Sequence, residues 1–487
     1  MTSVTVARHR TAIHRSEMSR PIRAAFADGL INPERDVFDY GCGHGDDLEH
    51  LRRQSIKCSG WDPSHRPDAQ RNPADVVNLG YVINVIENPD ERKAVLTASW
   101  QLARKLLIVS ARLTIEAKDE AGTPFADGLL TRTGTFQRFY EQNELREWID
   151  SSLNVSSVPA APGVFYVFRD QALHQSFIAS RYRRRTAVPR VRRSDILYEQ
   201  HKELLNSLID FLTARGRLPD ASESETVVEI CQHFGSLKRA WKVIRRITGD
   251  ELWESIRLER SQDLLIYLAL SRFSKRPTLS QLPRDLQFDV KAFFSTYQNA
   301  CVLADELLFS AGKSEIIEAA CRQSSVGKLT PNALYLHLSA LTLLPPVLRI
   351  YEGCARSYIG AVDGANIIKL HRRKPQVSYL SYPGFERDPH PALAASLVVP
   401  LQSFHIHYHE YSGAPNPPIL HRKEEFLSKE HPLYLKFSRL TKQEEKHCLY
   451  DEPEKIGTRS GWEEILNKKC IGYKGHRIIL IRRPVEK

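Results

Sequence analysis

Near its start the chain alternates short apolar blocks with polar segments. An apolar run over residues 37–40 is followed by a glycine-rich turn and a polar helical stretch from Asp46, and a second short run ends at Trp61. Strand, glycine turn, helix and strand in this order open a doubly wound α/β sheet. In such sheets ligands bind beyond the carboxyl ends of the strands, so the pattern predicts a Rossmann-like α/β domain with its ligand site at the glycine turn.

One unit of this sheet is too short to be complete. About a dozen residues separate Asp62 from Asp75, and they include Pro63, Pro67 and Pro73. Because a helix and a strand do not fit there, we expect the third-strand unit to be truncated to a loop. The periodicity predicts further strands over 75–79, 106–110 and 164–168, and helices over 91–107, 136–140 and 143–149.

The second half of the chain changes pattern twice. The interval 181–345 is dominated by helical periodicity, and the interval 346–487 by short alternating runs. We therefore expect an α/β domain over 1–180, a basic linker and helical domain over 181–345, and a small α+β domain over 346–487. The predicted helices are 196–215, 223–234, 237–248, 251–271 and 289–308, and the predicted strands are 367–370, 376–382, 397–399, 403–411 and 478–481.

Two features of this half carry chemical hypotheses. Helices 223–234 and 237–248 have helix-turn-helix spacing, and the second is basic. A solvated face with Trp241 and Ile244 buried is the alternative, which the sequence alone slightly favours. His405, His407 and His409 would share one strand face; a polar sheet face explains them better than a metal site, and no metal is expected.

Composition limits the class of protein. The 487 residues contain 42% hydrophobic residues, and the eight cysteines form no Cys-x-x-Cys pair. With no apolar run long enough to span a bilayer and no signal peptide, we expect a reduced, cytoplasmic protein of two or three domains that does not contact membranes.

The charge points to a polyanionic partner. The net charge is +11 and the isoelectric point is near 9.2. Arginines crowd one short stretch after the α/β domain, where they predict nucleic-acid contact, although a solvated linker is the alternative. The candidate contact residues are Arg183, Arg184, Arg185, Arg192 and Arg193.

The glycine turn has its own chemistry. Its Gly-x-Gly-x-Gly spacing matches neither the dinucleotide fingerprint nor a phosphate loop. Asp39, two residues before the first glycine, would repel a pyrophosphate but can pair with an ammonium group. Asp62 ends the second strand, where a carboxylate can accept hydrogen bonds from both ribose hydroxyls. S-adenosylmethionine has both groups, and its predicted contacts are Asp39, Gly41, Cys42, Gly43, Gly45, Asp62 and Asn78.

Residues 78–81 are the candidate catalytic turn. No Pro-Cys pair occurs in the chain, which counts against methylation of a base carbon through a cysteine nucleophile. Exocyclic amine methylation uses an Asp/Asn-Pro-Pro-Tyr/Phe turn, and Asn-Leu-Gly-Tyr has its first and last residues. Asn78 would hold the amine and Tyr81 would stack on the base. The alternative is that Asn78 shapes the cofactor loop and Tyr81 packs.

Longer strings carry a family resemblance. The motifs RHRTAI, FDYGCG, GWDP and NLGYVINVIE, together with YLALSRF, VGKL, YEGCAR, IIKLH, SYLSYP and PILHRK further along, resemble those of the bacterial DNA phosphorothioation-associated methyltransferases. These strings are specific and reach across nearly the whole chain. The resemblance implies a class I methyltransferase fold and a role beside a DNA phosphorothioation and restriction defence system, whose proteins would be partners.

Three functions are consistent with these features. The favoured one is an S-adenosylmethionine-dependent methyltransferase acting on DNA, on an exocyclic base amine. The second is a methyltransferase acting on RNA or another nucleotide-bearing substrate, which the incomplete turn and the truncated unit leave open. The third is a non-catalytic protein that binds modified DNA on a methyltransferase scaffold.

Overall fold

The computed structural model describes residues 6–117, 122–184, 196–403 and 405–481. The chain divides into two compact units. Unit 1 contains Met1–Leu173, Val326–Ala340 and Cys354–Lys487, and unit 2 contains His174–Ser325 and Leu341–Gly353. The division at 180 and 345 stays a prediction. In the described part of the chain, no helix is both long and apolar enough to cross a membrane.

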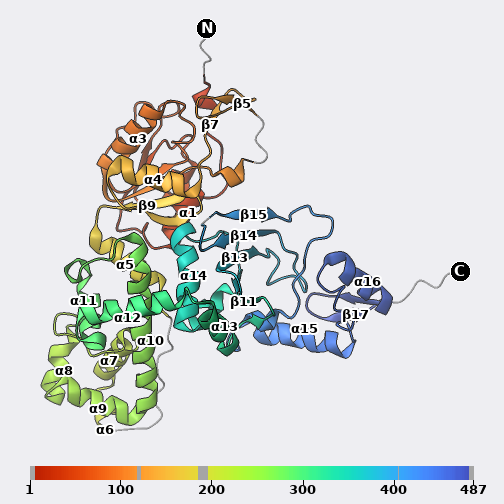
Figure 1. Ribbon diagram of the computed structural model, residues 1–487. Helices are drawn as coiled ribbons and strands as arrows, with labels where there is room; N and C mark the ends of the chain where they lie inside the picture. The colour runs from red at the N-terminus through yellow and green to blue at the C-terminus, as the bar shows by residue number, and fades with distance from the viewer. Residues whose placement is uncertain (1–5, 118–121, 185–195, 404, 482–487) are drawn as a thin grey trace. The chain divides into compact units, whose positions relative to one another are not determined.

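Unit 1 begins with an α/β segment, coloured red to yellow in Figure 1, whose six-stranded sheet has the order β2-β1-β3-β4-β9-β8. Strands β2, β1, β3 and β4 are parallel, whereas β9 is antiparallel to both β4 and β8. The strands are β1 (Val37–Tyr40), β2 (Cys58–Trp61), β3 (Ala74–Gly80), β4 (Ala103–Ser110), β8 (Val158–Ala161) and β9 (Val164–Phe168). The helices are α1 (Arg20–Ala27), α2 (Asp46–Arg53), α3 (Pro89–Leu102) and α4 (Gln142–Leu153).

Side-chain alternation along the strands separates the two faces of this sheet. On one face Phe38, Val77 and Leu107 form a core with Leu96 of α3 and Leu145 of α4. On the other face α1 packs against β3, β4 and β8. The predicted Rossmann-like α/β fold is confirmed.

The predicted truncation is also confirmed. Residues 62–73 join β2 directly to β3 without a helix or strand, so β2 is the edge of the sheet.

The residue Asn88, at the start of α3, accepts hydrogen bonds from the backbone N–H groups of Asp90 and Glu91 and so caps that helix.

The predicted helix over 136–140 is wrong. Phe136–Gln137 is β7, which pairs with β6 in a small sheet of β5 (Gly122–Phe125), β6 (Gly128–Thr131) and β7. The side chain of Phe136 is buried against Phe125. Tertiary pairing therefore overrides the local preference.

Unit 2 is helical, as predicted. Its helices are α5 (Gln171–Arg181), α6 (Ile196–Gln200), α7 (Lys202–Arg215), α8 (Thr226–Phe234), α9 (Leu237–Thr248), α10 (Asp250–Leu270), α11 (Arg284–Phe294), α12 (Tyr297–Ser310) and α13 (Ser314–Gln323). The helix predicted over 289–308 is two helices. Ser295 adopts a left-handed φ of 64° between them, and the Thr296 side chain caps α12.

A second six-stranded sheet, of order β10-β11-β12-β13-β14-β15, belongs to unit 1 and is antiparallel throughout. Its strands are β10 (Lys328–Leu329), β11 (Ala333–His337), β12 (Ile367–His371), β13 (Gln376–Ser381), β14 (Ala395–Pro400) and β15 (His407–Glu410). The remaining elements of this half are α14 (Pro346–Ile359), which spans the boundary between the two units, and α15 (Tyr434–Lys446), α16 (Arg459–Lys469), β16 (Ile471–Tyr473) and β17 (Ile478–Leu480) of unit 1. Short 3-10 segments are Arg8–Arg10, Thr114–Glu116, Ser271–Ser274, Leu279–Gln281, Leu338–Leu343 and Lys423–Phe426.

A buried carboxylate organises the end of the chain. Glu444 on α15 has no exposed surface, and one of its oxygens accepts hydrogen bonds from His390 (2.7 Å) and the Tyr473 hydroxyl (2.9 Å). The other accepts from the Tyr450 hydroxyl at 2.5 Å. Burial acts to raise the pKa of Glu444, but these hydrogen bonds outweigh it and leave the pKa below its usual value. The charge is therefore stabilised by its three donors.

Candidate cofactor site

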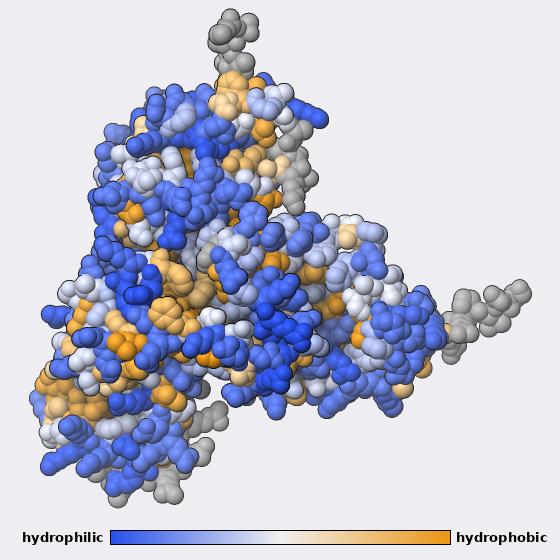
Figure 2. Space-filling view, viewed as in Figure 1, coloured by the Kyte–Doolittle hydropathy of each residue, from blue (hydrophilic) through white to orange (hydrophobic). Residues whose placement is uncertain are grey.

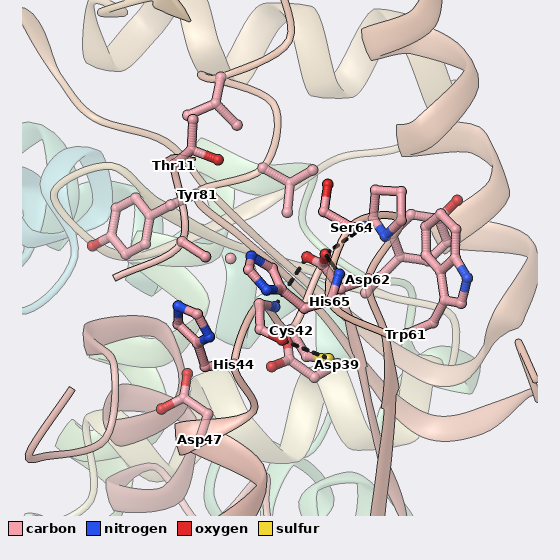
Figure 3. Close-up of a pocket in the computed structure, with 18 of the residues that line it drawn as sticks. Thr11, Asp39, Cys42, His44, Asp47, Trp61, Asp62, Ser64, His65 and Tyr81 are labelled. Carbon is pink, nitrogen blue, oxygen red and sulfur yellow. Dashed lines mark hydrogen bonds between the residues drawn. The ribbon is translucent and has the colours of Figure 1, made fainter. Parts of the chain in front are cut away.

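A cavity of about 260 Å³ lies at the carboxyl ends of β1, β2 and β3 (Figure 3). Its lining comes from the glycine turn 41–45, the end of β2, the exit of β3 and the segment 8–19, which we call the strap. All seven residues predicted to bind the cofactor line it. The position agrees with the rule for doubly wound sheets.

The glycine turn is packed closely by the protein itself. Gly41 has a φ of +82°, and a Cβ there would lie 2.4 Å from a methyl carbon of Val82. A Cβ on Gly43, which also has a positive φ, would lie 3.0 Å from the Cβ of Ala12 in the strap. These two glycines therefore admit the neighbouring chain, and a side chain at either position would displace the walls of the cavity.

Asp39 and Asn78 form the floor of the cavity. They are register partners on β1 and β3, and the Asn78 amide N donates to a carboxylate oxygen of Asp39 at 2.8 Å. Asp39 is 4% exposed and Asn78 is 2% exposed. Burial, reinforced by the nearby charge of Asp47, raises the pKa of Asp39 to about 7. The site thus holds a buried carboxyl group with no cation bonded to it among the described residues.

The side-chain oxygen of Asn78 has no hydrogen-bond partner within the described structure. A buried acceptor without a donor costs about 1–3 kcal/mol, so an orphan of this kind calls for a ligand or a water. The oxygen lies beside Asp39 in the wall of the same cavity. Together the two residues offer oxygen acceptors to a ligand that carries several N–H donors and a positive charge.

Asp62 ties the glycine turn to the loop after β2 (Figure 3). One carboxylate oxygen accepts from the Gly43 backbone N–H at 3.0 Å, and the other accepts from the N–H groups of Ser64 and His65, both at 2.9 Å. A carboxylate has about four acceptor sites, so Asp62 retains capacity for a ligand hydroxyl in the cavity. Asp62 follows β2 directly and lines the cavity, while its contact with a ribose stays a prediction.

Cys42 lines the cavity as a thiol. Burial, with the charge of Asp39, raises the pKa of Cys42 to about 12. Because the thiolate is the reactive form, Cys42 is suited to packing and not to nucleophilic attack near neutral pH.

Tyr81 stands at the exit of β3 in a strained backbone conformation. Its φ is 60°, and its backbone N–H is fixed to Ser110, 3.0 Å from the carbonyl oxygen and 3.1 Å from the hydroxyl. The Arg15 guanidinium lies 5.8 Å from the centre of the ring, and burial raises the pKa of the phenol. A non-glycine residue held at positive φ at the mouth of a cavity is a candidate for function.

The strap closes over the cavity through contacts that the sequence analysis missed. Arg8 forms bidentate pairs with Glu87 (2.9 and 3.0 Å) and Glu91 (2.6 and 2.7 Å). The backbone N–H of Arg15 donates to Asp46 at 2.6 Å, and that of Ser19 donates to Asp47 at 2.7 Å. Asp46 and Asp47, the adjacent acids at the start of α2, are the feature of the sequence that could have predicted the contacts with the strap.

Three imidazoles meet at the same end of the sheet. His14 of the strap stacks on His44 of the glycine turn at 4.0 Å, and His44 lies 4.4 Å from His65. Within the described residues no group of three His, Cys, Asp or Glu side chains is arranged to hold a metal ion.

The loop that replaces the third-strand unit packs on Trp61 at the end of β2. The Arg71 guanidinium lies 4.2 Å from the centre of the Trp61 ring, and it donates to the Tyr40 hydroxyl at 3.4 Å. Trp61 also lines the cavity. A flat ring next to Asp62 is a surface on which an adenine base can stack.

The predicted nucleic-acid contacts lie elsewhere in the chain, and only two are described. Arg184 pairs with Asp263 at 3.2 Å, and Arg183 lines a small cavity with Arg215 and Asp289 in unit 2. Burial lowers the pKa of both Arg183 and Arg184. Arg185, Arg192 and Arg193 lie outside the described residues.

Comparison with known proteins yields likenesses in fold alone. Neither a protein-family model nor a curated protein matches the chain. Among solved structures, the sugar N-methyltransferase KedS8 from Streptoalloteichus sp ATCC 53650 is 12% identical, with 33% of this chain and 96% of that chain covered and a TM-score of 0.25. The CcbJ methyltransferase from Streptomyces caelestis is 14% identical, with 33% and 93% covered and a TM-score of 0.23.

A third structure, the 1,6-didemethyltoxoflavin-N1-methyltransferase of Burkholderia thailandensis with bound S-adenosylhomocysteine, is 16% identical, with 31% of this chain and 78% of that chain covered and a TM-score of 0.22. At such values these likenesses carry no argument about chemistry. What this chain can do has to be inferred from its own residues.

Proposed function

We propose that this chain is an S-adenosylmethionine-dependent methyltransferase that acts on DNA. The observation that supports the cofactor is the pair at the floor of the cavity, a buried Asp39 carboxyl beside an unpartnered Asn78 oxygen. An α-ammonium group supplies both the positive charge and the N–H donors that this pair lacks. The second acid, Asp62, lies at the end of β2, where a ribose diol can donate to it.

Each of these residues would bind a different part of S-adenosylmethionine. Asp39 and Asn78 would hold the amino acid end, Asp62 the ribose, and Trp61 the base, while the close packing around Gly41 and Gly43 keeps the turn in its shape. S-adenosylmethionine supplies an electrophilic methyl group on a positively charged sulfur. In-line transfer then depends mainly on alignment, which a rigid cavity provides.

For catalysis we propose that Tyr81 stacks on the target base at the exit of β3. Its backbone N–H is bonded to Ser110 of β4, so the residue that carries the ring is anchored to the sheet. The amide N of Asn78 is already bonded to Asp39, which favours a role for Asn78 at the ammonium site over the predicted grip on an exocyclic amine.

The choice of DNA as substrate rests on charge and on the resemblance stated above. A net charge of +11 suits a polyanion. The resemblance to phosphorothioation-associated methyltransferases suggests that the duplex is one that carries, or will carry, sulfur on its backbone, and that proteins of such a defence system are partners.

The test is transfer of labelled methyl from S-adenosylmethionine to nucleic acid. The purified full chain would be given unmodified duplex DNA, the same duplex with phosphorothioate linkages, and an RNA of the same sequence. We expect label in DNA, and we expect Asp62→Ala to abolish it. Asp68→Ala is the matched control, because Asp68 is an exposed acid in the same loop that does not line the cavity.

The outcomes separate the alternatives. Label in RNA alone would keep the enzyme class and overturn the DNA substrate. Binding of S-adenosylmethionine without transfer to any of the three would favour a non-catalytic protein that binds modified DNA. Failure of the folded chain to bind S-adenosylmethionine at all would overturn the class.

A further inference from the structure

Helix α9 of unit 2 is basic along one side. Its 12 residues include five basic side chains and no acidic one. Ala240, Val243, Ile244 and Ile247 face the core of the unit, whereas the basic residues lie on the opposite, solvent side. The basic residues are Lys238, Arg239, Lys242, Arg245 and Arg246. We call this side of the helix the α9 face.

Most of the α9 face is available to a partner. Lys238, Arg239 and Lys242 are exposed, and within the described structure none of the three forms an ion pair. Arg245 pairs with Asp250 at 2.5 Å, beyond the end of the helix. The surface where α9 lies in Figure 1 is mostly hydrophilic in Figure 2. Lys238 and Arg239 are adjacent, and Lys242 lies one turn further along the helix. The α9 face therefore carries three positive charges that are not paired with an acidic side chain of the described residues.

The helix is held rigidly and enters after a tight turn. α8 ends at Phe234, Gly235 adopts a left-handed φ of 74°, and the Ser236 side chain caps α9 by accepting from the Arg239 backbone N–H at 3.3 Å. On the core side Trp241 of α9 packs edge-on against Trp253 of α10 at 4.8 Å. Two helices joined by a turn with glycine, with the second one basic, form the arrangement of a helix-turn-helix.

We infer that the α9 face binds duplex DNA, with α9 in the major groove and its lysines and arginines on the flanking phosphates. This inference rests on the proposed DNA substrate and adds a surface that grips it. The 12-residue helix is ~18 Å long, at about 1.5 Å per residue. The major groove of B-form DNA admits an α-helix, whereas that of A-form RNA is too deep and narrow, so DNA is the favoured duplex.

The structure thus favours the helix-turn-helix interpretation of these helices over a merely solvated face. Burial of Ile244 and partial burial of Trp241 account for the apolar side of α9. They leave unexplained why the opposite side carries only positive charge. Surface helices ordinarily mix both signs, and α9 does not.

The experiment measures DNA affinity of the full chain by fluorescence anisotropy with a labelled duplex, from about 50 to about 200 mM salt. The test variant is Lys238→Ala/Arg239→Ala/Lys242→Ala. The matched control is Arg284→Ala/Lys291→Ala/Lys313→Ala, which removes the same charge from exposed positions elsewhere in unit 2. Circular dichroism would establish that both variants retain the helical content of the parent.

We expect the test variant to bind at least tenfold more weakly at low salt. If all three side chains contact phosphates, the slope of log affinity against log salt should fall by about 2.7, since each contact contributes about 0.9. The control should keep both the affinity and the slope of the parent. Equal losses in the two variants, or tighter binding to duplex RNA than to DNA, would overturn the inference.

Failure here would be distinguishable from failure of the proposed function. Calorimetric binding of S-adenosylmethionine and methyl incorporation are measured on the same variants. If the test variant binds S-adenosylmethionine, methylates DNA and binds DNA like the parent, the result would support the proposed enzyme. It would also show that the α9 face is not its DNA-binding surface.

Discussion

The replacement Asp39→Asn should stabilise the cofactor-free protein while it weakens cofactor binding. The carboxyl of Asp39 is 4% exposed, and burial holds its pKa at about 7 where a free aspartate has 3.8. Folding therefore opposes ionisation of this group. An asparagine has nearly the same shape, carries no charge, and can still accept the hydrogen bond from Asn78 through its amide oxygen.

The magnitude follows from linkage. Below pH 3.8 the carboxyl is protonated in both the folded and the unfolded chain. Its full contribution to the free energy of unfolding is present there. As the pH rises towards the folded pKa of about 7, that contribution is lost at about 1.4 kcal/mol per pH unit. The full loss is about 4 kcal/mol above pH 7. Asp39→Asn escapes this loss, so its advantage over the parent should grow between about pH 4 and 7 and then level off.

Hydrogen exchange of the β1 and β3 amides is the suitable assay. Chemical unfolding of the full chain would combine two units, whereas exchange reports the opening free energy of the strands themselves. Asp36→Asn, three residues earlier, is the matched control of opposite sign. Burial acts to raise the pKa of Asp36, but hydrogen bonds from the Asp75 N–H and Arg104 lower it overall, so this variant should be less stable near neutral pH.

The same variant should lose cofactor affinity. Removal of one partner from a buried charge pair costs about 2–5 kcal/mol, so Kd for S-adenosylmethionine should rise at least ~30-fold. A pH-independent stability difference between Asp39→Asn and the parent would refute the assigned pKa. Unchanged cofactor affinity would refute the ammonium site.

Three further changes test other parts of the molecule. Gly41→Ala should destabilise unit 1 by about 1–3 kcal/mol in thermal unfolding, because its Cβ at a φ of +82° would collide with Val82. Tyr81→Ala should reduce methyl incorporation at least tenfold without changing cofactor affinity, while a phenylalanine at that position should retain activity; equal activity of all three would exclude a stacking role. Glu444→Gln should be less stable than the parent at neutral pH, and the difference should shrink as the pH falls below the usual 4.5, because the lowered pKa of Glu444 gives stability that is present above that value and lost in acid. Melting temperatures measured across this range check the last prediction, and a constant difference would contradict it.

The sequence predicted the parts of the fold that local pattern determines. Residues 37–61 fold as strand, glycine turn, helix and strand, and the short interval from Asp62 to Asp75 correctly indicated a truncated unit. The predicted range of α9, 237–248, is the range observed. In each case a strong local signal, glycine, proline or an N-cap serine, marks the ends.

The misses come from pairings with other segments of the chain. Phe136 forms a strand because it pairs with Leu130 of β6 across a short hairpin, which the helical pattern of residues 136–140 concealed. The pairing of Arg8 with Glu87 and Glu91 brings together residues that are 79 and 83 positions apart. At the site, the identities of Asp39 and Asp62 were readable, but the unpartnered oxygen of Asn78 depends on register across two strands.

The most direct test of the cofactor site is calorimetric titration of the full chain with S-adenosylmethionine, repeated on Asp62→Ala and on the exposed control Asp68→Ala. We expect one molecule bound per chain, with binding lost in Asp62→Ala and retained in Asp68→Ala. A folded parent chain that releases no heat with S-adenosylmethionine, or an Asp62→Ala variant that binds as tightly as the parent, would contradict the proposed site.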